Sequence, residues 1–209
     1  MAKKKKRIGA RTIGYCARRI YLDLVRAPQL PLNDAVRKIF REGRIVEDMA
    51  ILYLKEAMGL DVVGQQRSLI FEDTVSGKID GCYGQVAIRP SGGVVEIKSA
   101  ATRKFKRMVK SRDFSEYLDQ PYFYADEGEF EKILLFVVDR DTSIAQGFIK
   151  DPLIVPLAPN PERVQYLKNR ALELMAGAGN DEIPPAEMTP DDIQCFFCPH
   201  SVTCSIIGR

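Results

Sequence analysis

Apolar residues recur every three to four positions in several parts of the chain, a spacing that is typical of helices packed along one side. Four such stretches are predicted to be helical: residues 8–30 (ending before Pro28), 34–58, 113–126 and 160–176. Asn33 or Asp34 is expected to cap the second helix and Gly59 to end it, while Asn160 caps the last one. Pro121 predicts a kink or a restart within the third.

Runs rich in β-branched and aliphatic residues predict strands, at residues 61–72, 132–138 and 143–149 and twice within 77–99. The run 132–138 is apolar almost throughout, as in the buried strands of parallel sheets. Within 77–99, turn-forming residues at 89–93 separate the two apolar runs, which predicts a hairpin. The chain has 209 residues, enough for one compact α/β domain with a hydrophobic core.

Charged residues follow or end both strands of this hairpin. Asp80 follows the first apolar run, and Glu96 and Lys98 occupy alternate positions in the second. Because alternate side chains of a strand share a face, Glu96 and Lys98 point the same way, and Asp80 can reach the same point. Two carboxylates suit a hard divalent cation, and an ammonium can orient or deprotonate a water. The ordinary alternatives are a solvated strand face and an Asp-Gly turn.

The combination of an Asp with a Glu-x-Lys on the next strand resembles the PD-(D/E)XK nuclease superfamily. The resemblance implies a restriction-endonuclease-like core, in which helices flank a mixed central sheet. It also implies that Asp80, Glu96 and the backbone carbonyl of Ile97 bind Mg²⁺ or Mn²⁺, and that Lys98 positions the attacking water.

Three of the five cysteines lie close together near the end of the sequence: Cys195, Cys198 and Cys204. In a cytosolic protein such a tight set is more typical of metal binding than of disulfides. Two residues are candidates for the fourth ligand of such a site. His200 would complete a Cys₃His zinc site, and Cys16 would complete the four thiolates of an iron–sulfur cluster. Cys82 is expected to be a buried structural residue.

The cysteine pattern resembles RecB-like nucleases that carry an iron–sulfur cluster, whose compact forms include the CRISPR-associated adaptation exonucleases and their viral and prophage relatives. The shared features are the Tyr-Cys-x-Arg-Arg-x-Tyr sequence around Cys16 and the proline after Cys198. The resemblance implies a [4Fe–4S] cluster on Cys16, Cys195, Cys198 and Cys204. That cluster would join segments 13–30 and 185–209 around a catalytic core at 34–150. Residues 1–209 would then form a single nuclease domain with a basic tail at 1–12.

Two further motifs of that family are matched in the expected order. RecB-like nucleases carry Gly-x-x-x-His on the first core helix, where this chain has Gly43 and Glu47. Glu47 is therefore expected as an additional carboxylate ligand, which leaves the metal preference open. The family also carries Gln-x-x-x-Tyr on the helix after the Glu-x-Lys strand. Gln120 and Tyr124 match it and would orient Lys98 or touch the scissile strand.

The net charge of the chain is only +3, so affinity for nucleic acid has to come from local patches. Six cations lie between Arg103 and Arg112, directly after the Glu-x-Lys strand. This segment is predicted to be a phosphate-contacting loop in which Arg103, Lys104, Lys106 and Arg107 hold the DNA backbone; the alternative is an exposed basic face. The single histidine excludes a His-rich site, and no apolar run is long enough for a membrane span. No signal-type segment follows the basic start, so a cytoplasmic location is expected.

These patterns predict a metal-dependent deoxyribonuclease, an exonuclease acting on single-stranded DNA ends. Its expected setting is CRISPR spacer acquisition or viral or recombination DNA processing, with an integrase-type adaptation complex or recombination proteins as partners. The main alternative is a non-catalytic DNA-binding module stabilised by zinc. A third hypothesis is a nuclease-fold subunit that works only inside a larger complex that captures DNA ends.

Overall fold

The computed structural model describes residues 6–84, 92–189 and 191–208. Its strands are β1 (Ile8–Gly9), β2 (Ser68–Phe71), β3 (Val75–Lys78), β4 (Gly81–Tyr83), β5 (Gly93–Ala100), β6 (Lys132–Asp139) and β7 (Leu153–Leu157). Its α-helices are α1 (Ala17–Leu24), α2 (Asp34–Met58), α3 (Thr102–Ser111), α4 (Asp119–Glu127), α5 (Arg140–Gln146), α6 (Pro161–Gly179), α7 (Ile193–Phe196) and α8 (Ser201–Ile207). Two short 3₁₀ helices are η1 (Ala10–Thr12) and η2 (Ser115–Tyr117).

The strands form two sheets. The larger has the order β4-β5-β6-β7, with β5 and β6 parallel and both outer pairs antiparallel. The smaller has the order β1-β3-β2. The larger sheet is thus mixed, as expected, and its central pair is the Glu-x-Lys strand β5 beside the apolar strand β6.

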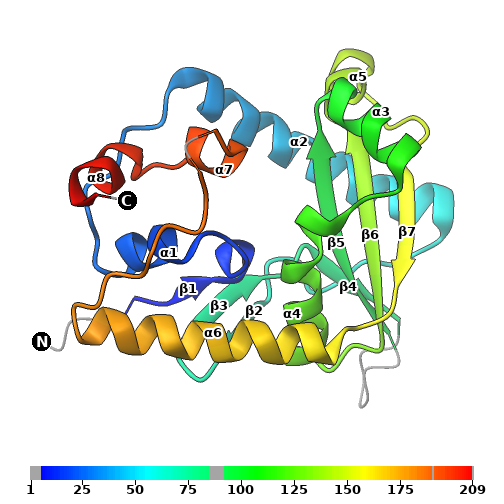
Figure 1. The fold of residues 1–209 in the computed structure, drawn as a ribbon. Coiled ribbons are helices and arrows are strands. Elements are labelled where there is room, and N and C mark those ends of the chain that lie inside the picture. The colour runs from blue at the N-terminus through cyan, green and yellow to red at the C-terminus, as the bar shows by residue number, and fades with distance from the viewer. Residues whose placement is uncertain (1–5, 85–91, 190, 209) are drawn as a thin grey trace, which may run out of the picture.

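Helices cover both faces of the larger sheet. Alternate residues of β6 belong to different core clusters, because successive side chains of a strand point to opposite faces. Leu134, Phe136 and Val138 pack with the buried side of α2, whereas Leu135 and Val137 pack with α3. In Figure 1, α2 runs from this sheet across to the C-terminal helices α7 and α8, which lie near α1. No helix in the described ranges is long and apolar enough to cross a membrane.

The capping residues explain where the long helices begin and end. The Asn33 side chain accepts a hydrogen bond from the Val36 amide at 2.9 Å, and Gly59 ends α2 in the left-handed conformation, with φ 65°. Asn160 likewise caps α6. Pro121 lies in the first turn of α4, where its missing N–H costs no helical hydrogen bond, so the predicted restart is confirmed.

The strand predicted at 143–149 is wrong, because that segment begins inside helix α5. Asp139 caps this helix by accepting from the Thr142 amide at 3.2 Å, and Gly147 ends it at φ 76°. The neighbour of β6 is instead β7, which is antiparallel to it and contains Pro156. A proline is tolerated there because β7 is an edge strand.

Three other predictions change in extent. The strand expected at 61–72 is shorter, since only β2 and an isolated bridge from Val63 to Cys82 are formed there. The basic tail expected at 1–12 ends earlier, because Ile8 and Ala10 are buried in β1 and η1. The hairpin is formed by β4 and β5, while the turn residues at 89–91 lie outside the described part of the chain.

Candidate active site

Asp80 lies in the turn between β3 and β4 and faces the middle of β5. Its carboxylate accepts a hydrogen bond from the backbone N–H of Ile97 at 2.7 Å. Burial raises the pKa of Asp80, while the Ile97 hydrogen bond and the charges of Lys98 and Arg11 act in the opposite direction. Asp80 is thus held against the peptide that follows Glu96, as the sequence pattern predicted.

Glu96 is fully buried on β5, with no exposed surface. Its Oε1 contacts the Lys98 ammonium, but its Oε2 has no hydrogen-bond partner among the described residues. Burial raises the pKa of Glu96 to about 7, because the Lys98 charge offsets only part of the desolvation and Asp80 adds repulsion. A buried carboxylate oxygen without a partner is an unfavourable arrangement that a bound cation would relieve.

A chain of hydrogen bonds fixes Lys98. Its Nζ donates to Gln120 Oε1 at 2.9 Å, and Gln120 Nε2 donates to the Tyr124 hydroxyl at 3.1 Å. Both partners lie one turn apart on α4, so a single helical face presents them to β5. Burial raises the pKa of Tyr124, and the negative charges of Glu96 and Asp80 raise it further, so the phenol stays protonated.

Gly77 is a residue of this site that sequence reasoning did not single out for a role. A Cβ atom at this position would lie 2.5 Å from the Tyr124 hydroxyl and 2.7 Å from the Ala10 side chain. Any side chain here would therefore displace Tyr124. Its proximity to Asp80 in the sequence was visible, but its contact with α4 depends on the fold.

Glu47 approaches the same site from α2. Its Oε1 accepts a hydrogen bond from Gln66 Nε2 at 3.1 Å. Burial raises the pKa of Glu47, and the negative charge of Asp80 raises it further. The structure thus brings Asp80, Gln120 and Tyr124 to the middle of β5, where Glu96 and Lys98 lie, and Glu47 lies within electrostatic range of Asp80.

Within the described ranges, no group of three or more His, Cys, Asp or Glu side chains is arranged ready to hold a metal ion. The carboxylates are organised around Lys98 and the Ile97 amide instead. Their chemistry nevertheless fits a divalent cation, since Glu96 has an unpartnered buried oxygen and Asp80 and Glu47 lie close by. Oxygen ligands of this kind are those that Mg²⁺ and Mn²⁺ prefer.

The unpartnered oxygen leads to a stability prediction for Glu96→Gln. A carboxyl whose pKa is raised from 4.5 to about 7 lowers stability progressively as pH rises through that window. Without divalent cations, the variant should therefore be more stable than wild type at pH 8, by up to about 3 kcal/mol, and should lose this advantage near pH 5. Thermal unfolding at both pH values measures the difference. Mg²⁺ or Mn²⁺ should raise the Tm of wild type but not of the variant; equal shifts would place the metal elsewhere.

The basic segment after β5 is helix α3 rather than the predicted loop. Asp141 holds its start by accepting from the Thr102 amide at 3.0 Å. Arg103, Lys106 and Arg107 are exposed, whereas Lys104 pairs with Glu116 and lies over the Tyr117 ring. The helix thus presents a dense positive surface in which Lys104 is the least available cation.

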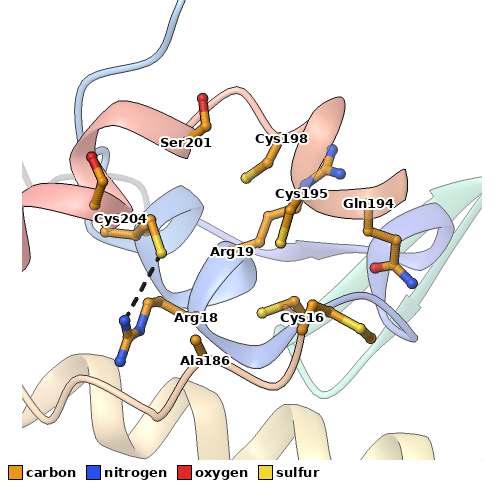
Figure 2. Close-up of a pocket in the computed structure, with 12 residues that line it drawn as sticks. Cys16, Arg18, Arg19, Ala186, Gln194, Cys195, Cys198, Ser201 and Cys204 are labelled. Carbon is orange, nitrogen blue, oxygen red and sulfur yellow. Dashed lines mark hydrogen bonds between the residues drawn. The ribbon is translucent and has the colours of Figure 1, made fainter. Parts of the chain in front are cut away.

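The four predicted cluster ligands line one cavity of about 150 Å³ between α1 and the C-terminal helices. Figure 2 shows Cys16 on one side and Cys195, Cys198 and Cys204 on the other. Burial raises the pKa of Cys195, and the charges of the other three cysteines raise it further, which shows their mutual proximity. The thiols line the cavity without meeting at one point, in agreement with the absence of a ready-made metal group among the described residues.

Two arginines give this cavity a positive wall. Arg18 donates to Cys204 Sγ at 3.9 Å, and the buried Nε of Arg19 has no hydrogen-bond partner in the described part of the chain. Thiolates coordinated to a metal are negative, so these groups fit an anionic thiolate cluster. A single zinc ion would draw four sulfur atoms to about 2.3 Å from one point, whereas the cavity leaves room for a larger group.

His200 is buried next to the cysteine segment but is oriented elsewhere. Its Nδ1 lies 3.0 Å from the Pro28 carbonyl oxygen, and its Nε2 lies 3.1 Å from Asp23 and 3.3 Å from Gln29. Both ring nitrogens therefore have protein partners. Cys82 is buried in the core, as expected, with its Sγ 3.4 Å from the Val63 carbonyl oxygen.

No protein-family model matches the chain, and no curated protein matches it significantly in sequence. Several solved structures do match the chain. An alkaline exonuclease (LHK-Exo) from Laribacter hongkongensis matches with a TM-score of 0.64 at 12% identity, covering 86% of this chain and 91% of that one. Its complex with dAMP matches at 0.62 and 13%, with the same coverage. SSO0001 matches at 0.55 and 17%, covering 98% of this chain and 88% of that one. At these identities the likeness establishes the fold, and the expected mixed α/β core of the restriction-endonuclease type is confirmed.

Proposed function

We propose that this protein is a divalent-metal-dependent deoxyribonuclease that acts on single-stranded DNA ends. The observation that supports this most strongly is the buried Glu96, with its unpartnered oxygen, beside Asp80 and Lys98 at the middle of β5. The shared fold adds support, because the LHK-Exo structures belong to an alkaline exonuclease, one of them in complex with dAMP.

Asp80, Glu96, Glu47 and the Ile97 carbonyl would hold one or two divalent cations, which would supply Lewis-acid stabilisation of the negative phosphate and the leaving oxygen. Lys98 would orient the attacking water, and its contacts with Gln120 and Glu96, which hold its ammonium, support this role. Tyr124 remains a neutral hydrogen-bonding group and holds Gln120 in register. Glu96 has to be ionised to bind a cation, and burial raises its pKa, so acid pH should weaken cation binding and with it cleavage.

The four-cysteine cavity is proposed to hold a [4Fe–4S] cluster with a structural role. Phosphodiester hydrolysis transfers no electrons, so the cluster is not needed for the chemistry. The cluster would instead join α1 to the C-terminal segment. Cys16 lies at the start of α1, and the C-terminal segment contributes Cys195, Cys198 and Cys204. Cluster binding would draw the four thiolates together and would couple cluster assembly to the ordering of both segments.

The biological setting follows as part of the same proposal: processing of DNA ends during CRISPR spacer acquisition, or in viral or recombination reactions, together with an adaptation or recombination complex. The distinguishing experiment compares linear and circular single-stranded DNA of the same sequence, with Mn²⁺ or Mg²⁺. We expect the linear form to be shortened from an end and the circle to persist. Equal loss of both forms would reject action at ends while leaving nuclease activity intact.

Helix α3 provides a prediction about binding. Arg103, Lys104, Lys106 and Arg107 are proposed to contact phosphates, so replacing Arg103 and Arg107 by Ala should weaken DNA binding regardless of sequence. The slope of log K against log salt should become shallower by about 1.4, since each contact to a single strand contributes about 0.7. Replacing the exposed Lys55 and Lys132 removes the same charge elsewhere and is the matched control. Equal slopes for the two variants would mean that α3 is an exposed basic face that does not contact DNA.

A further inference from the structure

The side of α2 that faces the larger sheet continues past the edge of that sheet. Ala50 and Leu54 are fully buried against it, and Glu47 reaches the candidate metal site. Further towards the N-terminus, a Cβ at Gly43 would lie 3.8 Å from the Ser99 hydroxyl, so the helix still lies beside the end of β5. Phe40 comes next on this stripe, because positions 40, 43 and 47 share one helical face.

Phe40 is 41% exposed, whereas Ala50 and Leu54 further along the same stripe are fully buried. Seven residues separate it from Glu47, which corresponds to about 10 Å along the helix. The Phe40 ring is thus close enough to the candidate cleavage site to contact a nucleotide a few positions away from it.

Arg11, on η1, lies over this ring. Its guanidinium carbon is 6.0 Å from the centre of the Phe40 ring. The guanidinium is exposed and forms no ion pair within the described ranges, although its charge acts on both Asp80 and Glu96. An exposed cation without an ion-pair partner among the described residues and an exposed aromatic ring therefore lie together, on elements that α1 separates in the sequence.

We propose that Phe40 and Arg11 form a nucleotide grip, in which the Phe40 ring stacks on an unpaired base and Arg11 binds an adjacent phosphate. This inference rests on the proposed function and specifies its substrate. A base can offer its face to a side chain only where it is not stacked inside a duplex, so the grip selects a single-stranded end. Arg11 also supplies positive charge where the DNA approaches three carboxylates, which would otherwise repel the backbone.

The absence of tryptophan from the chain makes stacking directly measurable. Phe40→Trp places the sole indole at the proposed grip, and Tyr166→Trp places one at a half-exposed position on α6, on the other side of the molecule (Figure 1). Both changes are made on an Asp80→Asn background, so that DNA is bound but not cut. Binding of a labelled oligonucleotide is followed by anisotropy in the same samples.

The grip predicts that single-stranded DNA quenches the fluorescence of the Phe40→Trp protein and leaves that of the Tyr166→Trp protein unchanged. Blunt duplex DNA should cause little quenching even where it binds. If the oligonucleotide binds and the two proteins respond equally, or the duplex quenches as strongly as the single strand, the grip is wrong while the nuclease proposal stands. Absence of cleavage by wild type would instead reject the nuclease proposal, whatever the fluorescence shows.

A second pair of variants tests the consequence for turnover. Phe40→Ala should raise KM for single-stranded DNA by about fivefold or more, as expected for the loss of one stacked base, with kcat little changed. Leu52→Ala removes a similarly exposed apolar side chain from the same helix and should alter neither value. Alanine favours the helix, so unfolding of α2 is not expected to explain a loss. An unchanged KM for Phe40→Ala would overturn the proposal.

Discussion

Asp80→Asn, Glu96→Gln and Lys98→Met are each expected to lower the rate of DNA cleavage by about a thousandfold or more, since each removes several kcal/mol of transition-state stabilisation. Lys98→Met should act in two ways, because it removes the lysine itself and also changes the protonation of Glu96. The lysine charge is the main influence that keeps the Glu96 pKa from rising further, so its loss would leave Glu96 protonated and unable to bind a cation. Single-turnover cleavage of an end-labelled strand measures the loss, and anisotropy should show that DNA binding persists.

Two exposed residues near the same sheets provide matched controls. Lys78→Met and Glu72→Gln make the same chemical changes outside the proposed site and should retain wild-type rates. Any of the three site variants that cleaves at the wild-type rate would be removed from the mechanism. Loss of activity in the controls as well would point to a general effect of charge.

The cysteine variants are expected to have the largest effect on stability. Replacing Cys16, Cys195, Cys198 or Cys204 by Ser should abolish the brown colour of protein purified without oxygen, with its broad absorbance near about 400 nm. Because the cluster would connect α1 with the C-terminal helices, its loss should lower the Tm by about 10 °C, as several kcal/mol would in a chain of this size. Iron and sulfide analysis together with thermal unfolding measures both effects.

Cys82→Ser is the control for this series, because Cys82 lies in the core away from the cavity and a serine can also donate to the Val63 carbonyl. It should keep both colour and iron. Colourless wild-type protein carrying one equivalent of zinc, with His200 required and Cys16 dispensable, would reject the cluster and favour the zinc-module hypothesis. The contacts of His200 with Pro28 and Asp23 argue for the opposite result.

The elements that local chemistry dictates were predictable from the sequence. Helix α2 begins and ends at its expected capping residues, and β6 is a buried strand parallel to β5 because its apolar run leaves no polar face. Helix α5 was missed because Ile144, Phe148 and Ile149 resemble a strand, although Asp139 and Gly147 are its cap signals. Strand β7 was missed because Pro156 lies within it and Pro152 precedes it, and prolines argue against a strand.

The site likewise contains contacts that the sequence predicted and contacts that depend on the fold. The alternation of Glu96 and Lys98 places them on one face from sequence alone, and their contact is found in the structure. The approach of Gln120 to Lys98 was anticipated only through the family motif. Arg11 and Gly77 carry no local signal, because their proximity to the site arises from the packing of η1 and β3 against α4.

The central claim is that a divalent cation at Asp80 and Glu96 allows this protein to hydrolyse DNA. The most direct test incubates anaerobically purified protein with an end-labelled linear single strand, with Mn²⁺, with Mg²⁺, and with a chelator. We expect cleavage with at least one cation, none with the chelator, and none by Asp80→Asn prepared in parallel. Folded, brown wild-type protein that leaves the strand intact with both cations, or cleavage that persists equally in Asp80→Asn, would contradict the account.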